Sequence, residues 1–271
     1  MRGLMVIVLP ALVAALAQGA EEKPYIFVQA HRGFSAEYPE LTLLAFEKAV
    51  EVGADRIEMD LSITEDGHAV LMHDTTVDRT TDGSGRVESF TLNELKELDA
   101  GSWMAPEFAG ERVPSLSEVI ELVQGRATLN LEVKSLDRRW SWVERVVEET
   151  VRTVHEHGAQ DWVIYSSFDL RALLEVREHD PEARLMIIDW AGPGRFDGLT
   201  IAIEQDLFAW TPSAEYATEE RIRRGAGADL SIHVGTSPGG RLHDWIEWGV
   251  NGFSSGNPRA LIDWLERHGY R

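Results

Sequence analysis

The stretch Arg56-Ile57-Glu58-Met59-Asp60-Leu61 sets the fold, because apolar and acidic residues alternate along it. Successive side chains of a strand point to opposite faces, so Glu58 and Asp60 share one face and the apolar residues share the other. The same alternation occurs in Leu129-Asn130-Leu131-Glu132-Val133-Lys134. In a parallel barrel the apolar outer face packs against helices, and the polar face points inward near the carboxyl ends of the strands. The pattern therefore predicts a barrel with Glu58, Asp60 and Glu132 inside it.

Segments of strand and helix character alternate along the rest of the chain. Strands are expected at 25–30, 56–61, 69–72, 128–133, 162–166, 184–188, 207–210, 230–234 and 252–254, and helices at 42–52, 140–157, 169–178, 215–224, 243–248 and 258–268. About eight βα units fit this order, which favours an α/β fold of the TIM-like (β/α)8 type over an open sheet. The segment 75–114 is too long for a βα loop. It is expected to form a small insertion after the second βα unit that shapes substrate access, or else a passive surface excursion.

Composition narrows the class of protein. The chain has 271 residues and a formal charge of −20, with no cysteine. A length of this order suits one barrel domain, expected at 21–271. Strong acidity argues against a nucleic-acid partner. The lack of cysteine excludes thiol catalysis and thiolate metal ligands. Nothing in the sequence indicates a protein partner.

Residues 1–20 have the pattern of a secretory signal peptide, which predicts a secreted or periplasmic protein. Arg2 supplies the positive start, and the run from Leu4 to Leu16 is almost wholly apolar. The run falls short of the roughly 20 apolar residues that a membrane span needs. An uncleaved anchor is the alternative interpretation. No later segment is apolar enough to predict a stable membrane span.

The negative charges of three carboxylates that point into the barrel must be compensated, because burying unpaired charges costs several kcal/mol each. One divalent cation bound by Glu58, Asp60 and Glu132 would compensate them. Oxygen ligands favour a hard ion, Ca²⁺ or Mg²⁺. The alternative is a buried salt-bridge network of these acids with Lys134 and Arg32.

Two histidines and two cations accompany the acids at strand ends. His31 and His73 each follow an expected strand, where a barrel places its active site, and suit general acid and base roles. Arg32 and Lys134 suit a phosphate group. Asp74, which follows His73, could orient another group or cap a turn. The set predicts a metal-assisted phosphate-ester site.

The order and spacing of these residues resemble the glycerophosphodiester phosphodiesterase family. The matching motifs are His31-Arg32-Gly33, Pro39-Glu40-Leu41-Thr42, Gly53-Ala54-Asp55, Glu58-Met59-Asp60, Thr64-Glu65-Asp66-Gly67, His73-Asp74, Leu131-Glu132-Val133-Lys134, Ser167-Phe168 and Gly249-Val250-Asn251-Gly252. The resemblance implies a TIM-like barrel that hydrolyses glycerophosphodiesters to sn-glycerol 3-phosphate and an alcohol. It assigns Glu58, Asp60 and Glu132 to the metal, His31 and His73 to acid–base catalysis, and Arg32 and Lys134 to phosphate. It also implies a mechanism in which a glycerol hydroxyl attacks phosphorus and a cyclic phosphate then opens.

The chain departs from the family pattern at three places. Leu41 stands where the family usually has Asn, Gly235 where it often has Trp, and Ser255-Gly256-Asn257-Pro258 replaces a Thr-Asp-Tyr-Pro pattern. Trp190 or Trp210 is expected to replace the missing aromatic wall. These departures leave open a lysophospholipase D-like or sugar-phosphodiester substrate. A non-enzymatic binding protein on the same barrel is a further alternative, against which the intact histidines argue.

Overall fold

Eight parallel strands close into a barrel in the computed structural model, which describes residues 23–135, 138–189, 197–236 and 240–271. The barrel strands are β1 (Phe27–His31), β2 (Arg56–Ile63), β4 (Thr128–Glu132), β5 (Val163–Ser167), β6 (Leu185–Asp189), β7 (Ala209–Pro212), β8 (Ser231–Gly235) and β9 (Gly252–Ser255). Neighbours follow chain order, and β1 pairs with both β2 and β9, which closes the ring. The predicted TIM-like barrel is confirmed.

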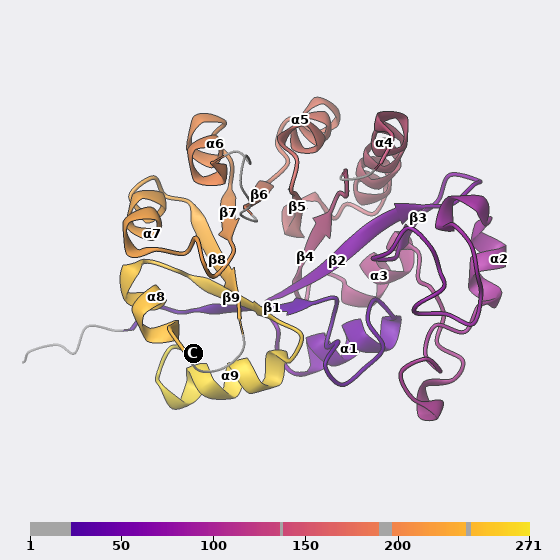
Figure 1. Cartoon of the computed structure of the whole chain (residues 1–271), viewed down its shortest axis with the longest axis horizontal. Helices are drawn as coiled ribbons and strands as arrows, with labels where there is room; N and C mark the ends of the chain where they lie inside the picture. Colours follow the sequence, from indigo (N-terminus) through magenta and orange to yellow (C-terminus); the bar gives the residue numbers. More distant parts are fainter. Residues whose placement is uncertain (1–22, 136–137, 190–196, 237–239) are drawn as a thin grey trace, which may run out of the picture.

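Helices surround the strands (Figure 1). They are α1 (Leu43–Glu51), α3 (Leu116–Val123), α4 (Trp140–Glu156), α5 (Leu170–His179), α6 (Gly198–Glu204), α7 (Glu219–Ala226), α8 (Leu242–Trp248) and α9 (Pro258–Arg267). Side chains at the start of several helices accept a backbone N–H and so fix where the helix begins. Thr218 caps α7 in this way, so the helix expected at 215–224 lies at 219–226. The prediction did not include α3 or α6; α6 starts at a glycine and contains Thr200 and Ile201, which favour helix weakly.

The insertion follows the second barrel strand and precedes α3, the helix of that βα unit. It begins with β3 (Ala69–Leu71), which pairs antiparallel with the far end of β2. It continues through the 3-10 turns Val87–Ser89 and Pro106–Phe108 and the helix α2 (Leu92–Glu97), and it projects beside the barrel in Figure 1. A small apolar core of its own holds it together, formed by Val70, Met72, Val77, Val87, Leu95, Ala100 and Val113.

The outer faces of the strands are apolar and form one core with the helices, while the barrel interior is polar. Met59 and Leu131 belong to the outer core. The interior holds a hydrogen-bonded group of buried side chains: Asn130 donates to Gln29, and Gln29 donates to Ser254. His233 lies 3.4 Å from Gln29 and 3.5 Å from a guanidinium nitrogen of Arg56. This group forms the floor on which the candidate site rests.

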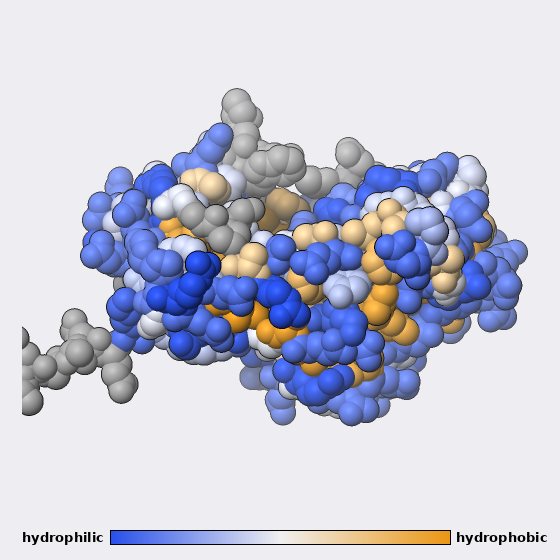
Figure 2. Space-filling model, turned by 90° about the horizontal axis from the view of Figure 1, so that it is seen from below, coloured by the Kyte–Doolittle hydropathy of each residue, from blue (hydrophilic) through white to orange (hydrophobic). Residues whose placement is uncertain are grey.

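The outer surface is mainly hydrophilic. Figure 2, seen from below the view of Figure 1, shows apolar side chains in separate patches between polar ones. No helix of the described residues has the length and apolar character needed to cross a membrane. The expected signal peptide lies outside the described residues.

Candidate active site

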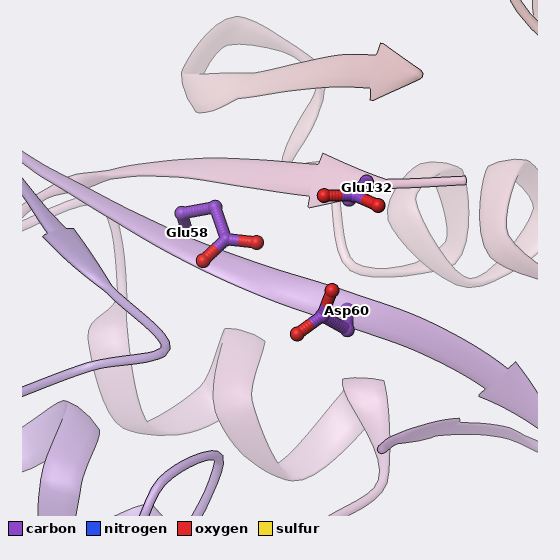
Figure 3. A group of neighbouring side chains, drawn as sticks. All are labelled: Glu58, Asp60 and Glu132. Carbon is purple, nitrogen blue, oxygen red and sulfur yellow. The ribbon is translucent and has the colours of Figure 1, made fainter. Parts of the chain in front are cut away.

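Three carboxylates converge inside the barrel, as the alternating pattern predicts. The parallel register of β2 and β4 sets Asp60 opposite Glu132, and Glu58 lies one inward position earlier on β2. One oxygen of each residue lies within 4.8 Å of the others, and the residues are 4%, 1% and 8% exposed in the order Glu58, Asp60, Glu132. Figure 3 shows the carboxylates turned toward a common space.

Two cations contact this group, so the predicted salt-bridge alternative is partly realised. The Lys134 ammonium lies 2.8 Å from Asp60 Oδ1 and 3.1 Å from Glu132 Oε1. Arg32 Nε lies 3.4 Å from Asp60 Oδ2. Although burial lowers the pKa of Lys134, the charges of Asp60 and Glu132 raise it above its usual value. The lysine is therefore held as a cation between the two acids.

The ion pairs leave acceptor capacity unused. Glu58 Oε1 and Asp60 Oδ2 are buried and accept no hydrogen bond from the described residues. Burial raises the pKa of Glu58, and the charge of Asp60 raises it further. Burial likewise raises the pKa of Glu132, again with Asp60 as the second cause. Three hard carboxylate donors, with a buried oxygen on Glu58 and another on Asp60 that accept no hydrogen bond from the described residues, fit a divalent cation, which would compensate the charge that Lys134 and Arg32 do not.

The loop after β1 brings Arg32 to the acids through an unusual backbone conformation. Arg32 has φ 57°, in the left-handed region that costs an ordinary residue about 1–2 kcal/mol. In this conformation its backbone N–H donates to Glu58 Oε2 at 2.9 Å. Gly33 follows with φ 78°, and a Cβ there would meet the backbone of Ala45 at 2.9 Å, so α1 packs directly against the turn. Strain of this kind is typical of functional sites.

His31 lies at the edge of the acidic group. Its Nε2 atom is 3.8 Å from Glu58 Oε2, and its side chain is about half exposed. Desolvation in the site lowers the pKa of His31, and the adjacent Arg32 charge lowers it further. The neutral ring, which can accept a proton, is therefore favoured.

His73 reaches the site through a different set of contacts. Its Nδ1 atom lies 2.6 Å from Asp74 Oδ1. Arg79 donates to Asp74 Oδ2 at 2.6 Å and to Glu40 Oε1 at 2.7 Å. Glu40 Oε1 in turn accepts a hydrogen bond of 3.2 Å from Arg32. The Arg79 hydrogen bond lowers the pKa of Asp74 to about 2, so Asp74 faces His73 as a carboxylate.

A cavity of about 170 Å³ opens beside the acids. Glu58 and Glu132 line one side, and Phe168, Met186 and Ile188 line another. Such a combination of polar groups with an apolar wall is typical of small-molecule sites.

The departures from the family pattern have structural consequences around this cavity. Gly235 lines the cavity, and a Cβ at that position would meet no described atom within 4 Å. Trp210 was expected to replace the aromatic wall, but this expectation is wrong. Its side chain is fully buried, its indole N–H donates to Asp189, and it is absent from the described lining residues. Trp190 lies outside the described residues.

The comparisons with known proteins agree with the geometry. The family model described as "Glycerophosphoryl diester phosphodiesterase family" matches residues 31–191. A glycerophosphodiester phosphodiesterase of Caldanaerobacter subterraneus subsp. tengcongensis is 43% identical over 246 residues, covering 89% of this chain and 98% of that protein. The chain belongs to the glycerophosphoryl diester phosphodiesterase family. The predicted family and the enzyme class, phosphoric diester hydrolase, are thus confirmed at the level of the family.

Other members of the glycerophosphoryl diester phosphodiesterase family are similar over most of the chain. The glycerophosphodiester phosphodiesterase of Bacillus subtilis is 30% identical over 262 residues, covering 91% of this chain and 89% of that protein. A solved phosphodiesterase of Oleispira antarctica, in complex with the product sn-glycerol-3-phosphate, has a TM-score of 0.79 and 27% identity, covering 89% of this chain and 96% of that chain. A small-molecule phosphodiester substrate fits this family.

Sequence reasoning missed two residues of the site. Glu40 stood inside one of the quoted family motifs but received no role, and Arg79 lies in the insertion. A signal for Arg79 was present, because it follows the predicted His73-Asp74 pair by only five residues. The buried floor residues Gln29 and His233 were also missed, since isolated polar residues on a strand carry no pattern of their own.

Proposed function

We propose that this chain hydrolyses glycerophosphodiesters to sn-glycerol 3-phosphate and an alcohol, with one divalent cation, Ca²⁺ or Mg²⁺, bound by Glu58, Asp60 and Glu132. The observation that carries the proposal is the group of three buried carboxylates beside Arg32 and Lys134, in which Glu58 Oε1 and Asp60 Oδ2 accept no hydrogen bond from the described residues. The Oleispira antarctica relative, which holds sn-glycerol-3-phosphate, supports the assignment of the product.

Each residue of the site is given one role in the proposed reaction. A bound divalent cation would neutralise negative charge on a phosphoryl oxygen. Arg32 and Lys134 add positive charge beside the same position. His31, favoured as the neutral ring, accepts the proton of the attacking glycerol hydroxyl. His73, beside the Asp74 carboxylate that stabilises an imidazolium, gives a proton to the departing alcohol. Water then opens the cyclic phosphate with the two proton transfers reversed.

Release of glycerol phosphate from glycerophosphocholine and glycerophosphoethanolamine tests the proposal. Each substrate is incubated with Ca²⁺, with Mg²⁺ and with chelator, using wild type, His31→Ala and His73→Ala. We expect metal-dependent release, and losses in each histidine variant of the order of 10²- to 10⁴-fold, the usual contribution of acid–base catalysis. Release that is equal in the presence of chelator, or that survives both substitutions, would contradict the proposed mechanism. No turnover by a folded, metal-bound protein would exclude these substrates and leave lysophospholipids, sugar phosphodiesters and the binding-protein alternative.

The open space beside Gly235 favours one second candidate. A lysophospholipid carries an acyl chain on its glycerol and a sugar phosphodiester carries a larger alcohol than ethanolamine, and the cavity has no described wall at Gly235. Competition between glycerophosphoethanolamine and a lysophospholipid for the same enzyme distinguishes the two. The ratio of the two kcat/KM values identifies the preferred class.

We also propose that the chain is exported, to the periplasm or the medium. The support is the pattern of residues 1–20, with Arg2 before the apolar run and small residues near the end. Mass measurement of the protein recovered from cell fractions tests this. A mature species that lacks about the first 20 residues is expected outside the cytoplasm.

A further inference from the structure

Arg79 is supplied by the insertion and held by a well-anchored turn. Its neighbours Val77 and Thr80 are buried, and Val77 belongs to the core of the insertion. The Thr80 hydroxyl contacts the sulfur of Met72, and Thr81 bonds back to Val77 through both its backbone N–H and its hydroxyl. The turn is therefore fixed, while the Arg79 side chain remains 43% exposed and reaches out of the insertion.

The guanidinium of Arg79 bridges two carboxylates that come from separate parts of the chain. It donates from Nε to Asp74 Oδ2 at 2.6 Å, and from a terminal nitrogen to Glu40 Oε1 at 2.7 Å and Asp74 Oδ1 at 3.3 Å. Glu40 precedes Arg79 by 39 residues and belongs to the loop after β1. A planar fork with several donors suits such a bridge, and a lysine ammonium cannot reproduce its two-edged geometry.

Each of the two carboxylates contacts a different residue of the site. Asp74 lies against His73 Nδ1, which keeps a proton on Nδ1 and makes Nε2 the atom that gives and accepts the transferred proton. Glu40 accepts a hydrogen bond from the guanidinium of Arg32, which also lies 3.4 Å from Asp60. One arginine thus joins the histidine on one side of the site to the phosphate-binding arginine on the other.

We propose that Arg79 is a positioning residue that fixes the orientation of His73 through Asp74 and that of Arg32 through Glu40. The inference rests on the roles given to His73 and Arg32 in the proposed function. Without Arg79, Asp74 and Glu40 lose the cation that they share. Asp74 is then free to turn away from His73. Glu40 is free to compete with the substrate phosphate for Arg32.

A kinetic test distinguishes the contact of Arg79 with Asp74 from its contact with Glu40. We expect Asp74→Asn to lower kcat with little change in KM, and Glu40→Gln to raise KM through Arg32. Arg79→Gln should show both effects, with kcat about 10- to 100-fold lower, the loss typical of a residue that orients a catalytic group. Arg79→Gln should lower kcat no further in the Asp74→Asn background, because both changes break the same link. Compared with Arg79→Gln, Arg79→Lys should restore part of the wild-type kcat and a smaller part of the wild-type KM. If the kcat losses of Arg79→Gln and Asp74→Asn are fully additive in the double variant, the proposal is overturned.

A matched control is available in the same insertion. Arg86 is 52% exposed and pairs with Glu88, so Arg86→Gln removes an insertion arginine whose described side-chain contact lies outside the site. We expect wild-type kcat and KM for this variant, with thermal unfolding of both variants near that of wild type. If Arg86→Gln lowers kcat as much as Arg79→Gln does, the loss reflects the insertion as a whole and the proposal fails.

A readout without turnover distinguishes this inference from the proposed function. In ¹⁵N–¹H correlation spectra of the histidine rings, His73 should carry its proton on Nδ1 in wild type. In Arg79→Gln, the proton should be shared between Nδ1 and Nε2. The same single tautomer in both proteins would overturn the positioning role, even if the enzyme is active. A tautomer change in a protein that hydrolyses no glycerophosphodiester would support the positioning role and contradict only the proposed substrate.

Discussion

Asp60 and Glu132 face each other across the parallel register of β2 and β4 and share the ammonium group of Lys134. The arrangement puts two buried carboxylates on one cation, with Glu58 as a third acid beside them. Lys134 therefore has a structural task in addition to its expected contact with phosphate. Its ammonium group links the two acids by ion pairs of 2.8 and 3.1 Å.

Lys134→Met is expected to destabilise the metal-free protein by about 3–5 kcal/mol, because it leaves two buried carboxylates without their partner. Urea unfolding in the presence of chelator measures the loss. Lys48→Met removes an exposed pair with Glu51 and serves as the control, for which no measurable change is expected. Equal losses in the two variants would show that the buried carboxylates do not depend on Lys134.

The metal-free protein is expected to lose stability as the pH rises from 7 to 9. Burial raises the pKa of Glu58 to about 8, above the ordinary value of 4.5 that it regains on unfolding. The folded state therefore binds this proton more tightly, and its advantage disappears as the pH passes through the folded pKa. His31 and His233, whose pKa values are lowered from 6.5, act in the opposite direction only at lower pH.

Thermal unfolding at pH 7, 8 and 9 with chelator checks this expectation. Glu58→Gln removes the titrating group and should flatten the dependence over that range. Added Ca²⁺ or Mg²⁺ should raise the unfolding temperature most at pH 9, since the ion binds the deprotonated acids. A metal-free wild type that is as stable at pH 9 as at pH 7 would show that Glu58 is ionised throughout.

Leu41→Asn is expected to lower stability slightly and leave kcat unchanged. Leu41 adopts φ 58°, a conformation that Asn tolerates better, which explains in physical terms why a family member can carry Asn there. Its side chain, however, is 4% exposed and belongs to the barrel core. Loss of about 2 kcal/mol of burial outweighs about 1 kcal/mol of relieved strain. Differential scanning calorimetry should show a decrease of about 2–4 °C; an increase would mean that strain dominates.

Gly235→Trp is expected to make the enzyme more selective for substrates without a bulky group. The position lies at the cavity and requires no left-handed backbone, so an indole can fill the open space without forcing the strand. The ratio of kcat/KM for glycerophosphoethanolamine to that for a lysophospholipid should rise about tenfold or more, the usual cost of excluding a bulky group. Gly235→Ala, which fills little of the space, is the control and should keep the wild-type ratio.

Alternation within short strands was enough to predict where the acids lie. Glu58, Asp60 and Glu132 share the inner face because a strand has a period of two, and that period can be read in one sequence. The link between Glu40 and Arg79 could not be predicted in this way. It joins two irregular segments 39 residues apart, and its geometry depends on how the insertion core packs. Helix α6 was not predicted for a related reason. Its sequence has a weak preference for helix, and packing of Gly198 against Asp189 compensates for this.

The residues assigned to metal, phosphate and proton transfer all lie between His31 and Lys134: most lie on or directly after β1, β2 and β4 of the barrel, and His73 follows β3 in the insertion. The apolar cavity wall comes instead from β5 and β6 and the open position from β8. Under the proposed function, the residues of the reaction and those of the apolar cavity wall thus lie in separate consecutive stretches of the chain. A chimera that keeps the first stretch and takes the second from a relative would exchange substrate preference while it inherits the reaction centre intact.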